Sequence, residues 1–271
     1  MAIQSKRHWE EIVKQEFNDQ QLIITRNIAH RLEGHFSFLK HYLLLTSQKP
    51  FNVQTLLAEL KEFGVEKIEI VEKIEIIPLL PEGVEEGPVI TSTYQPHPTK
   101  MPKNWNVDIK LPVDGKLLIC SVDVIWLCSQ FTEGIRSGKT GYAWIIDKSG
   151  HFLAHYERDF VGANAFEVRG RKGPLVSFTR INKLQKEYLL TGKEGVSWYV
   201  SGWHRKRKGL IKKLIAYTPV YYAGRDNPDK YWSVAVVAPI DEITVMIHGA
   251  ILRQWTIVGF IIICLGLAAG T

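Results

Sequence analysis

The sequence predicts a mixed α/β (α+β) protein with a long N-terminal helix, two antiparallel-sheet modules and a C-terminal transmembrane helix. Three observations predict this class. Apolar residues near the N-terminus recur every three to four positions, two later blocks contain short apolar runs separated by glycine turns, and the last residues form an uncharged run. The 271 residues, 45% of them hydrophobic and 23% charged, are enough for one large or two small globular domains.

The first expected element is one amphipathic helix within residues 1–50, which we interpret as a signalling helix. Residues 6–46 contain no proline and one glycine, and Pro50 ends the pattern. The apolar stripe is longer than one small domain requires, so we expect the helix also to pack against a partner helix in a homodimer. The stripe consists of Trp9, Val13, Phe17, Ile24, Ile28, Leu32, Phe36, Leu39 and Leu43.

Residues 51–128 read mainly as strands and form the first expected module. The segment VEKIEIVEKIEI, residues 65–76, repeats six residues unchanged, and an even repeat keeps its isoleucines (Ile68, Ile70, Ile74 and Ile76) on one face of a strand. We interpret it as a tolerated duplication in an edge strand or hairpin. Further strand candidates are PVITSTY, NVDIKLP and KLLICSVDVIWL, and the last continues into a short helix ending near Gly134. Cys120 and Cys128 are expected as small core residues, because no disulfide framework or zinc spacing is present.

Residues 129–240 form the second expected module. The runs YAWIID and HFLAHY are two strands joined by the turn KSG. A loop is expected over VGANAFEVRGRKG and a helix over PLVSFTRINKLQKEYLL, followed by the strands VSWYVSGWH, KKLIAYTPVYY and YWSVAVVAP. Two strands, a helix and three antiparallel strands are the order of a PAS-like sensor module.

The stretch Gly138-Lys139-Thr140 does not fit a nucleotide-binding P-loop. Only three residues separate Gly134 from Gly138 where the motif needs four, and a helix-like run precedes the stretch while a strand-like run follows it. Gly138 and Gly141 are therefore expected to be turn residues that start a strand.

Residues 241–271 are expected to form an exit helix and a transmembrane segment. WTIVGFIIICLGLAAGT, residues 255–271, carries no charge, and crossing a bilayer takes roughly 20 apolar residues. Trp255 and Arg253 suit the membrane interface. The N-terminus has no apolar region of the kind found in a signal peptide or a membrane span, which suggests a piece of a receptor whose upstream span is absent from this sequence.

The run TGYAWIIDKSGHFLAHYERDFVGAN, residues 140–164, resembles the start of a Cache sensory module, and LIAYTPV and YWSVAVVAPIDEI resemble its final strands and exit. The whole chain is similar to a double Cache domain, with a membrane-distal module at 51–128 and a membrane-proximal module at 129–240. The aromatic-arginine motif by which many double Cache domains hold amino acids is not visible here. Amino acids are therefore not a supported ligand.

The resemblance implies the extracytoplasmic or periplasmic small-molecule-sensing input domain of a receptor in the cytoplasmic membrane, first of all a bacterial or archaeal histidine kinase of a two-component system. A chemoreceptor input domain and a membrane-tethered binding module without output remain alternatives. No catalytic motif, metal site or cofactor site is expected in this chain, so it is not expected to be an enzyme. A full-length protein with a kinase part would be one, and turnover by the purified domain would revive a membrane enzyme.

The candidate pocket lies between the second sheet and its covering helix and loops. Strand alternation places Tyr142 with Trp144 on one face of a strand, while Trp198 and Tyr217 lie on two other strands. His155 could add a polar contact. Aromatic walls with few polar groups are typical of a small-molecule site, although they are equally typical of a core.

The basic run HRKRKGLIKK, residues 204–213, supplies much of the net charge of +6. Its position between two strands favours a solvated hairpin tip. Contact with anionic lipid headgroups is the functional alternative. Binding to nucleic acid is not expected of a membrane-anchored extracytoplasmic domain.

Overall fold

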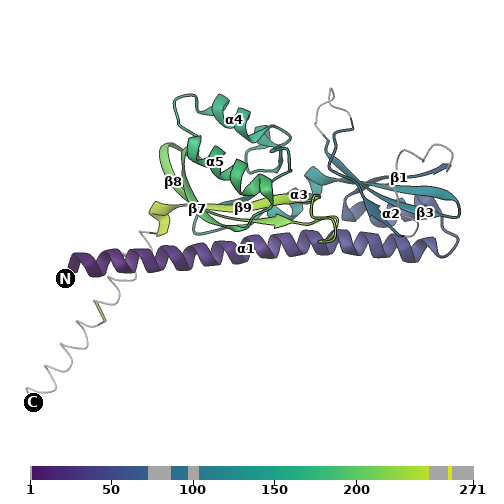
Figure 1. Cartoon of the computed structure of the whole chain (residues 1–271), viewed down its shortest axis with the longest axis horizontal. Coiled ribbons are helices and arrows are strands. Elements are labelled where there is room, and N and C mark those ends of the chain that lie inside the picture. Colours follow the sequence, from purple (N-terminus) through teal and green to yellow (C-terminus); the bar gives the residue numbers. More distant parts are fainter. Residues whose placement is uncertain (1, 73–86, 97–103, 244–255, 258–271) are drawn as a thin grey trace, which may run out of the picture.

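One helix runs along the whole length of the molecule and carries two antiparallel sheets, which lie in line beside it (Figure 1). The computed structural model describes residues 2–72, 87–96, 104–243 and 256–257. Helix α1 spans Ala2–Ser47, which confirms the predicted long N-terminal helix. Its buried face repeats every three to four residues, as expected of a helix packed along one side, and is formed by Ile28, Leu32, Phe36, Leu39 and Leu43.

The first sheet has the strand order β1-β4-β3-β2, with every neighbouring pair antiparallel. Strand β1 lies at its edge, and Ile68 is buried there while Ile70 is 46% exposed. The second half of the duplicated segment lies outside the described residues. The elements of this part are α2 (Val53–Leu60), a short 3₁₀ turn (Lys61–Phe63), β1 (Val65–Glu72), β2 (Val89–Ile90), β3 (Asn106–Val113), β4 (Lys116–Asp123) and α3 (Val124–Thr132).

The second sheet has the order β6-β5-β9-β8-β7 and is again antiparallel throughout. The predicted mixed α+β class with antiparallel sheets is therefore confirmed. The elements of this part are β5 (Tyr142–Ile146), β6 (Phe152–Ala154), a 3₁₀ turn (Arg158–Phe160), α4 (Ala165–Lys172), α5 (Thr179–Glu187), a second 3₁₀ turn (Leu189–Thr191), β7 (Gly195–His204), β8 (Arg207–Val220) and β9 (Trp232–Pro239).

Helix α4 corrects the sequence analysis, which expected a loop over residues 161–173. The side chain of Asn164 accepts a hydrogen bond from the backbone N–H of Phe166 and caps the helix (3.0 Å). This cap satisfies one of the unpaired N–H groups at the start of the helix. Of the glycines in this stretch, Gly170 lies within the helix and Gly173 directly follows its last residue.

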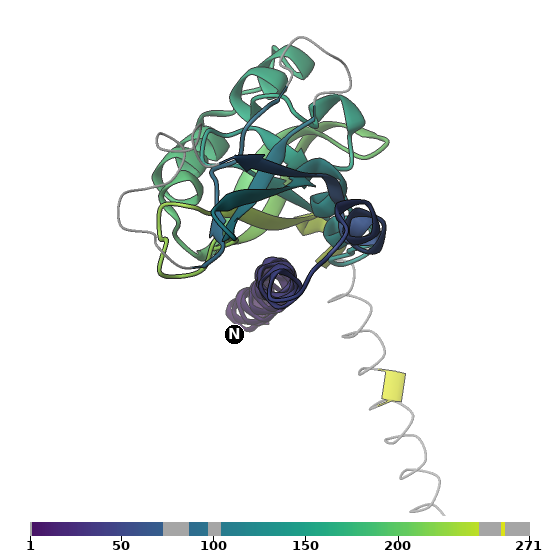
Figure 2. The same ribbon diagram turned by 90° about the vertical axis from the view of Figure 1, so that its right-hand side faces the viewer.

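The second sheet is covered on both faces, and strand alternation divides its side chains between them. Ala143 and Ile145 of β5 pack on the side of α1, whereas Tyr142, Trp144 and Ile146 pack on the side of α4 and α5. Seen end-on, α1 lies outside the sheets and away from α4 and α5 (Figure 2). The sheet therefore separates two cores.

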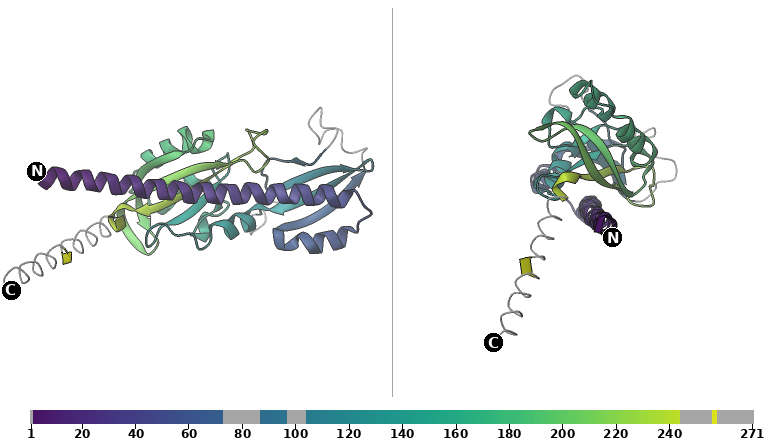
Figure 3. Two further views of the ribbon diagram at one scale, coloured as in Figure 1. Left: turned by 90° about the horizontal axis from the view of Figure 1, so that it is seen from below. Right: turned by 90° about the vertical axis from the view of Figure 1, so that its left-hand side faces the viewer.

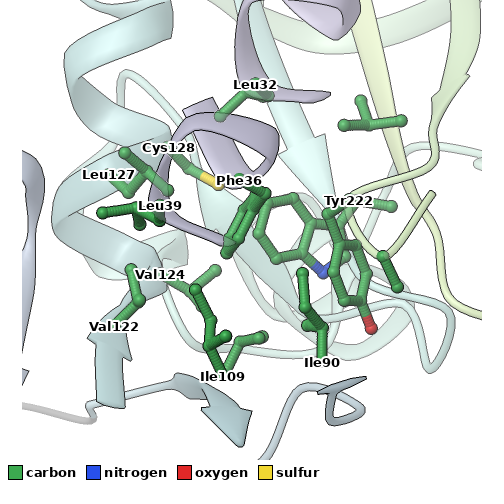
Figure 4. Close-up of a cluster of buried hydrophobic side chains, with 14 of the residues drawn as sticks. Leu32, Phe36, Leu39, Ile90, Ile109, Val122, Val124, Leu127, Cys128 and Tyr222 are labelled. Carbon is green, nitrogen blue, oxygen red and sulfur yellow. The ribbon is translucent and has the colours of Figure 1, made fainter. Parts of the chain in front are cut away.

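The larger core runs through both sheets and ties them to α1. Figure 4 shows Phe36 of α1 surrounded by side chains from β3, β4, α3 and the residues after β8. The ring of Phe36 lies 5.6 Å from that of Trp232 and 5.8 Å from that of Tyr222. Cys120 and Cys128 are buried in the same core, in the places expected of small apolar residues.

Gly141 stands where no side chain fits. A Cβ atom there would lie 2.1 Å from the carbonyl oxygen of Ser137 and 2.6 Å from that of Val237. We expect Gly141→Ala to destabilise the protein by about 1–3 kcal/mol or more, because neither backbone oxygen can rotate away. Gly170→Ala in α4 is the control, since its Cβ meets nothing within 4 Å and alanine favours a helix by about 1 kcal/mol. Equal urea midpoints for the two variants would contradict this account of Gly141.

The last strand of the second sheet, β9, ends beside the N-terminal half of α1 (Figure 3). Residues 240–243 are helical, and Ile243 packs with Leu214 of β8 against Val13 and Phe17 of α1. Within the described residues no helix is long and apolar enough to cross a membrane. The predicted membrane run, residues 255–271, lies outside them apart from residues 256–257.

Candidate ligand site

A small aromatic cavity lies between the second sheet and helices α4 and α5. Its volume is about 10 Å³, which is room for about one water molecule. Its walls are formed by side chains from β5, from β6 and the segment that follows it, from α4 and the N-cap of α5, and from β7 and β8. They are Tyr142, Trp144, Phe152, His155, Phe160, Arg169, Phe178, Tyr199, Ser201, Trp203 and Lys213.

Arg169 enters the aromatic cavity from the last turn of α4 and is 7% exposed. Its Nη1 donates a hydrogen bond of 2.6 Å to Oε1 of Gln185 on α5. The guanidinium carbon lies 5.4 Å from the ring centre of Phe152 and 5.7 Å from that of Trp144, within cation–π range. Burial lowers the pKa of Arg169 to about 10, so the group remains charged at neutral pH.

Lys213 reaches the same cavity from β8, where it shares one strand face with Ile211 and Ile215, and it is 1% exposed. Its Nζ lies 3.3 Å from the hydroxyl oxygen of Tyr142 and 5.8 Å from the ring centre of Tyr199. Burial lowers the pKa of Lys213 to about 7, with smaller contributions from the nearby positive charges of Arg169 and Lys172.

No carboxylate among the described residues forms an ion pair with Arg169 or Lys213. Lys172, at the rim, does have such a partner, because its Nζ forms an ion pair with Glu157. Burial lowers the pKa of Arg169, and the nearby Tyr199 and Tyr142 oppose this shift. Burial also lowers the pKa of Lys213, and the charges of Arg169 and Lys172 add to that shift. Two positive groups are therefore enclosed by aromatic rings without a protein counter-charge, an arrangement that is costly for an empty site.

The remaining polar groups of the aromatic cavity are neutral. Burial lowers the pKa of His155 well below 6.5, and its Nδ1 accepts a hydrogen bond of 3.0 Å from the backbone N–H of Glu157. The proton of the neutral ring is thereby assigned to Nε2. Burial raises the pKa of Tyr199 to about 12, so its hydroxyl keeps its proton. The site thus offers several hydrogen-bond donors.

Three of the five predicted site residues, Tyr142, Trp144 and His155, line this cavity. Trp198 does not, because it is 36% exposed on the surface. The guanidinium carbon of Arg180 and the Nζ of Lys212 lie 3.7 Å and 4.0 Å from its ring centre. Tyr217 is buried farther along the sheet, beside Tyr188.

Sequence reasoning missed both cations of the cavity. Arg169 was hidden in a stretch expected to be a loop, and Lys213 was counted in the basic run 204–213 as part of a solvated tip. The exposed lysines and arginines of that run agree with the tip, whereas Lys213 does not. Its position between Ile211 and Ile215 on one strand face is the signal that could have identified it.

A wider cleft of about 420 Å³ lies beyond Tyr142 and His155, which form walls of both spaces. The loop after α3 and the end of β6 make its other sides. The arginines along it, Arg136, Arg158 and Arg205, are exposed, unlike Arg169.

Tyr142 also connects the aromatic cavity with the start of the exit segment. Its ring lies 5.4 Å from that of buried His204, whose Nε2 is 2.7 Å from the hydroxyl oxygen of Thr140. The carboxylate of Glu242 accepts hydrogen bonds from the backbone N–H groups of Lys139 (2.9 Å) and Thr140 (3.1 Å). The turn before β5 is thus bound directly to the first residues after β9.

Comparison with known proteins identifies the fold. No protein-family model matches the chain, and no curated protein does. Among solved structures, the extracellular domain of the inferred histidine kinase vpHK1S-Z8 matches with a TM-score of 0.58 at 8% identity, over 87% of this chain and 96% of that one. The ligand-binding domain of Mlp24 with asparagine matches with 0.52 at 14% identity, over 88% and 98%.

A third match is the domain of an inferred sensory box/GGDEF family protein from Vibrio parahaemolyticus, with a TM-score of 0.55 at 8% identity, over 86% of this chain and 99% of that one. At such low identity these likenesses establish the fold alone. The chain has the fold of extracellular sensory and ligand-binding domains, as the Cache resemblance predicted.

Proposed function

We propose that the chain is the extracytoplasmic input domain of a membrane-bound signal-transduction receptor, in the first place a sensor histidine kinase, and that it senses a small molecule. The observation that carries this proposal is the aromatic cavity with two buried cations, in a fold shared with extracellular sensory domains. A buried polar site surrounded by aromatic walls is typical of small-molecule binding.

The proposed arrangement has a signalling helix (1–50), a distal Cache-like module (51–128), a proximal Cache module (129–240) and an exit into the membrane (241–271). The strand order β6-β5-β9-β8-β7, in which the first two strands sit beside the last, supports a PAS-like proximal module. Exposed apolar residues on α1, among them Ile23, Phe38 and Leu45, support the proposed homodimer through the helices. The output part would lie outside this sequence, on the cytoplasmic side.

A thermal-shift screen of metabolites against the purified 271-residue chain tests the sensing site. A compound at about 100 times its dissociation constant should add about 2.7 kcal/mol of stability. Trp203→Leu, in the cavity wall, should lose this shift, whereas Trp198→Leu on the same strand, outside the cavity, should keep it. Circular dichroism checks that both variants fold. A ligand-induced thermal shift that is kept in Trp203→Leu and lost in Trp198→Leu would show that the ligand binds outside the aromatic cavity.

A further inference from the structure

We propose that the ligand of the aromatic cavity is a small monocarboxylate that carries no ammonium group. This inference rests on the proposed sensing function and names the chemical class that the site takes. Its basis is the pair Arg169 and Lys213, which are enclosed in one cavity with no acidic partner among the described residues.

The charge of the cavity selects an anion. Placing a charged group away from water is costly unless an opposite charge compensates it. Lys172, at the rim, is compensated by Glu157, so the fold supplies a carboxylate there and none for the two cations inside. An anionic ligand would supply the missing counter-charge.

The donors of the cavity select a carboxylate among anions. The planar guanidinium of Arg169 can donate two parallel hydrogen bonds to a carboxylate, and Lys213 and Nε2 of His155 can donate to its free lone pairs. The rest of the wall is aromatic, which suits a short apolar tail and makes burial of a second negative charge unfavourable.

The same wall argues against an amino acid. An α-ammonium group needs carboxylate or carbonyl acceptors, and the titratable side chains that line the described cavity are cations, tyrosines and one neutral histidine. Arg169 and Lys213 would repel the ammonium group. A carboxylate and the amino acid with the same carbon skeleton should therefore be told apart.

The present volume of about 10 Å³ limits the size of the ligand. Room for two to four carbon atoms requires the rings of Tyr142 and His155, which separate the cavity from the wider cleft, to move. Tyr142 also contacts Lys213 and His204, and His204 is hydrogen-bonded to Thr140 in the turn that binds Glu242. A movement of the Tyr142 ring would therefore change contacts beside that turn.

The test uses the full 271-residue chain and matched probes. Acetate, propionate, butyrate and pyruvate are compared by thermal shift and calorimetry with propionamide, alanine and inorganic phosphate. We expect a stabilising shift with at least one carboxylate, and none with propionamide or alanine. Lys213→Met and Arg169→Met should each weaken carboxylate binding on the order of tenfold to a hundredfold, because each removes a charged hydrogen bond.

Lys212→Met, the exposed neighbour on β8, is the control and should change affinity by less than about twofold.

The pH dependence gives a readout that a merely structural lysine would not move. Above pH 7 the unliganded Lys213 loses its proton, so carboxylate affinity should fall by up to about tenfold per pH unit. Four titratable groups face Lys213 across the cavity. Arg169, with a pKa of about 10, stays largely charged between pH 7 and 9, while Tyr142, Tyr199 and His155 stay neutral. Burial also lowers the pKa of Lys172 at the rim, whose Nζ is paired with Glu157. Lys213→Met should therefore abolish the slope.

The outcomes separate this inference from the proposed function. Equal stabilisation by propionamide or alanine that is lost in Trp203→Leu would leave the sensing site standing and overturn the carboxylate. Stabilisation by phosphate alone, or carboxylate binding unaffected by both methionine variants, would also overturn it. If no carboxylate and no metabolite of the wider screen stabilises the chain, both the site and the ligand class are wrong.

Discussion

Replacement of Lys213 by methionine is expected to raise the stability of the ligand-free protein at pH 7 by about 1–4 kcal/mol. Methionine fills a similar volume among the aromatic rings without placing a charge there, whereas the ammonium group of Lys213 is 1% exposed and has no acidic partner within the described residues. Urea denaturation of the wild-type protein and of Lys213→Met measures the difference in their free energies of unfolding. The same variant should bind carboxylates about tenfold to a hundredfold more weakly, so stability and binding change in opposite directions.

The sign of the pH dependence follows from the lowered pKa. Lys213 titrates at about 7 in the folded protein and at its ordinary 10.5 once unfolded. Between these values the unfolded chain binds more protons, so the stability contributed by this residue rises with pH across that window. The advantage of Lys213→Met should be greatest below pH 7 and vanish above about pH 10.5.

Lys212→Met serves as the control for this prediction, because it removes an exposed lysine from the same strand and should shift stability by no more than about 0.5 kcal/mol. A wild-type protein more stable than Lys213→Met at pH 6 would show that the buried ammonium group has a compensating partner.

Insertion of four glycines after Ile240 is expected to abolish the output of the complete receptor while leaving carboxylate affinity of this chain within a few-fold. The insert separates β9 from Glu242, whose carboxylate binds the turn before β5, and from Ile243, which packs against α1. The cavity walls all precede the insertion point. A flexible joint would therefore keep the site and lose the displacement that follows binding.

Four glycines also change the rotation of the following helix, since each helical residue turns it by about 100°. A four-alanine insert at the same place is the control that keeps the helix stiff while shifting its phase. Calorimetry measures binding, and a kinase or methylation assay measures output. An unimpaired response in the glycine variant would rule out a rigid transmitting joint.

The elements with strong local patterns could be predicted from the sequence. The stripe from Ile28 to Leu43 predicted α1 because a helix of that length has one buried face. The strands β3 to β9 were also identifiable from short apolar runs between turns. Helix α4 was not, since its eight residues include a glycine and three basic side chains, and only the cap at Asn164 indicates a helix.

The sequence predicted part of the aromatic wall of the candidate site, but it did not predict the two buried cations. Tyr142 and Trp144 were found because alternation on one strand is a local property. Arg169 and Lys213 are 44 residues apart in the sequence numbering, and only the packing of α4 over β8 brings them into one cavity. Burial of a basic residue is unusual, so composition alone favours the surface for both.

The turn at residues 137–141 determines how this joint can vary among related sequences. Glu242 receives two of its hydrogen bonds from main-chain N–H groups, which every residue except proline possesses. Substitutions at Lys139 would leave those bonds in place, while Gly141 admits no side chain and Glu242 must keep an acceptor that reaches the turn. Natural variation should therefore be wide at position 139 and narrow at positions 141 and 242. In an alignment, this connection would be visible as two isolated conserved positions about 100 residues apart, and not as a continuous motif.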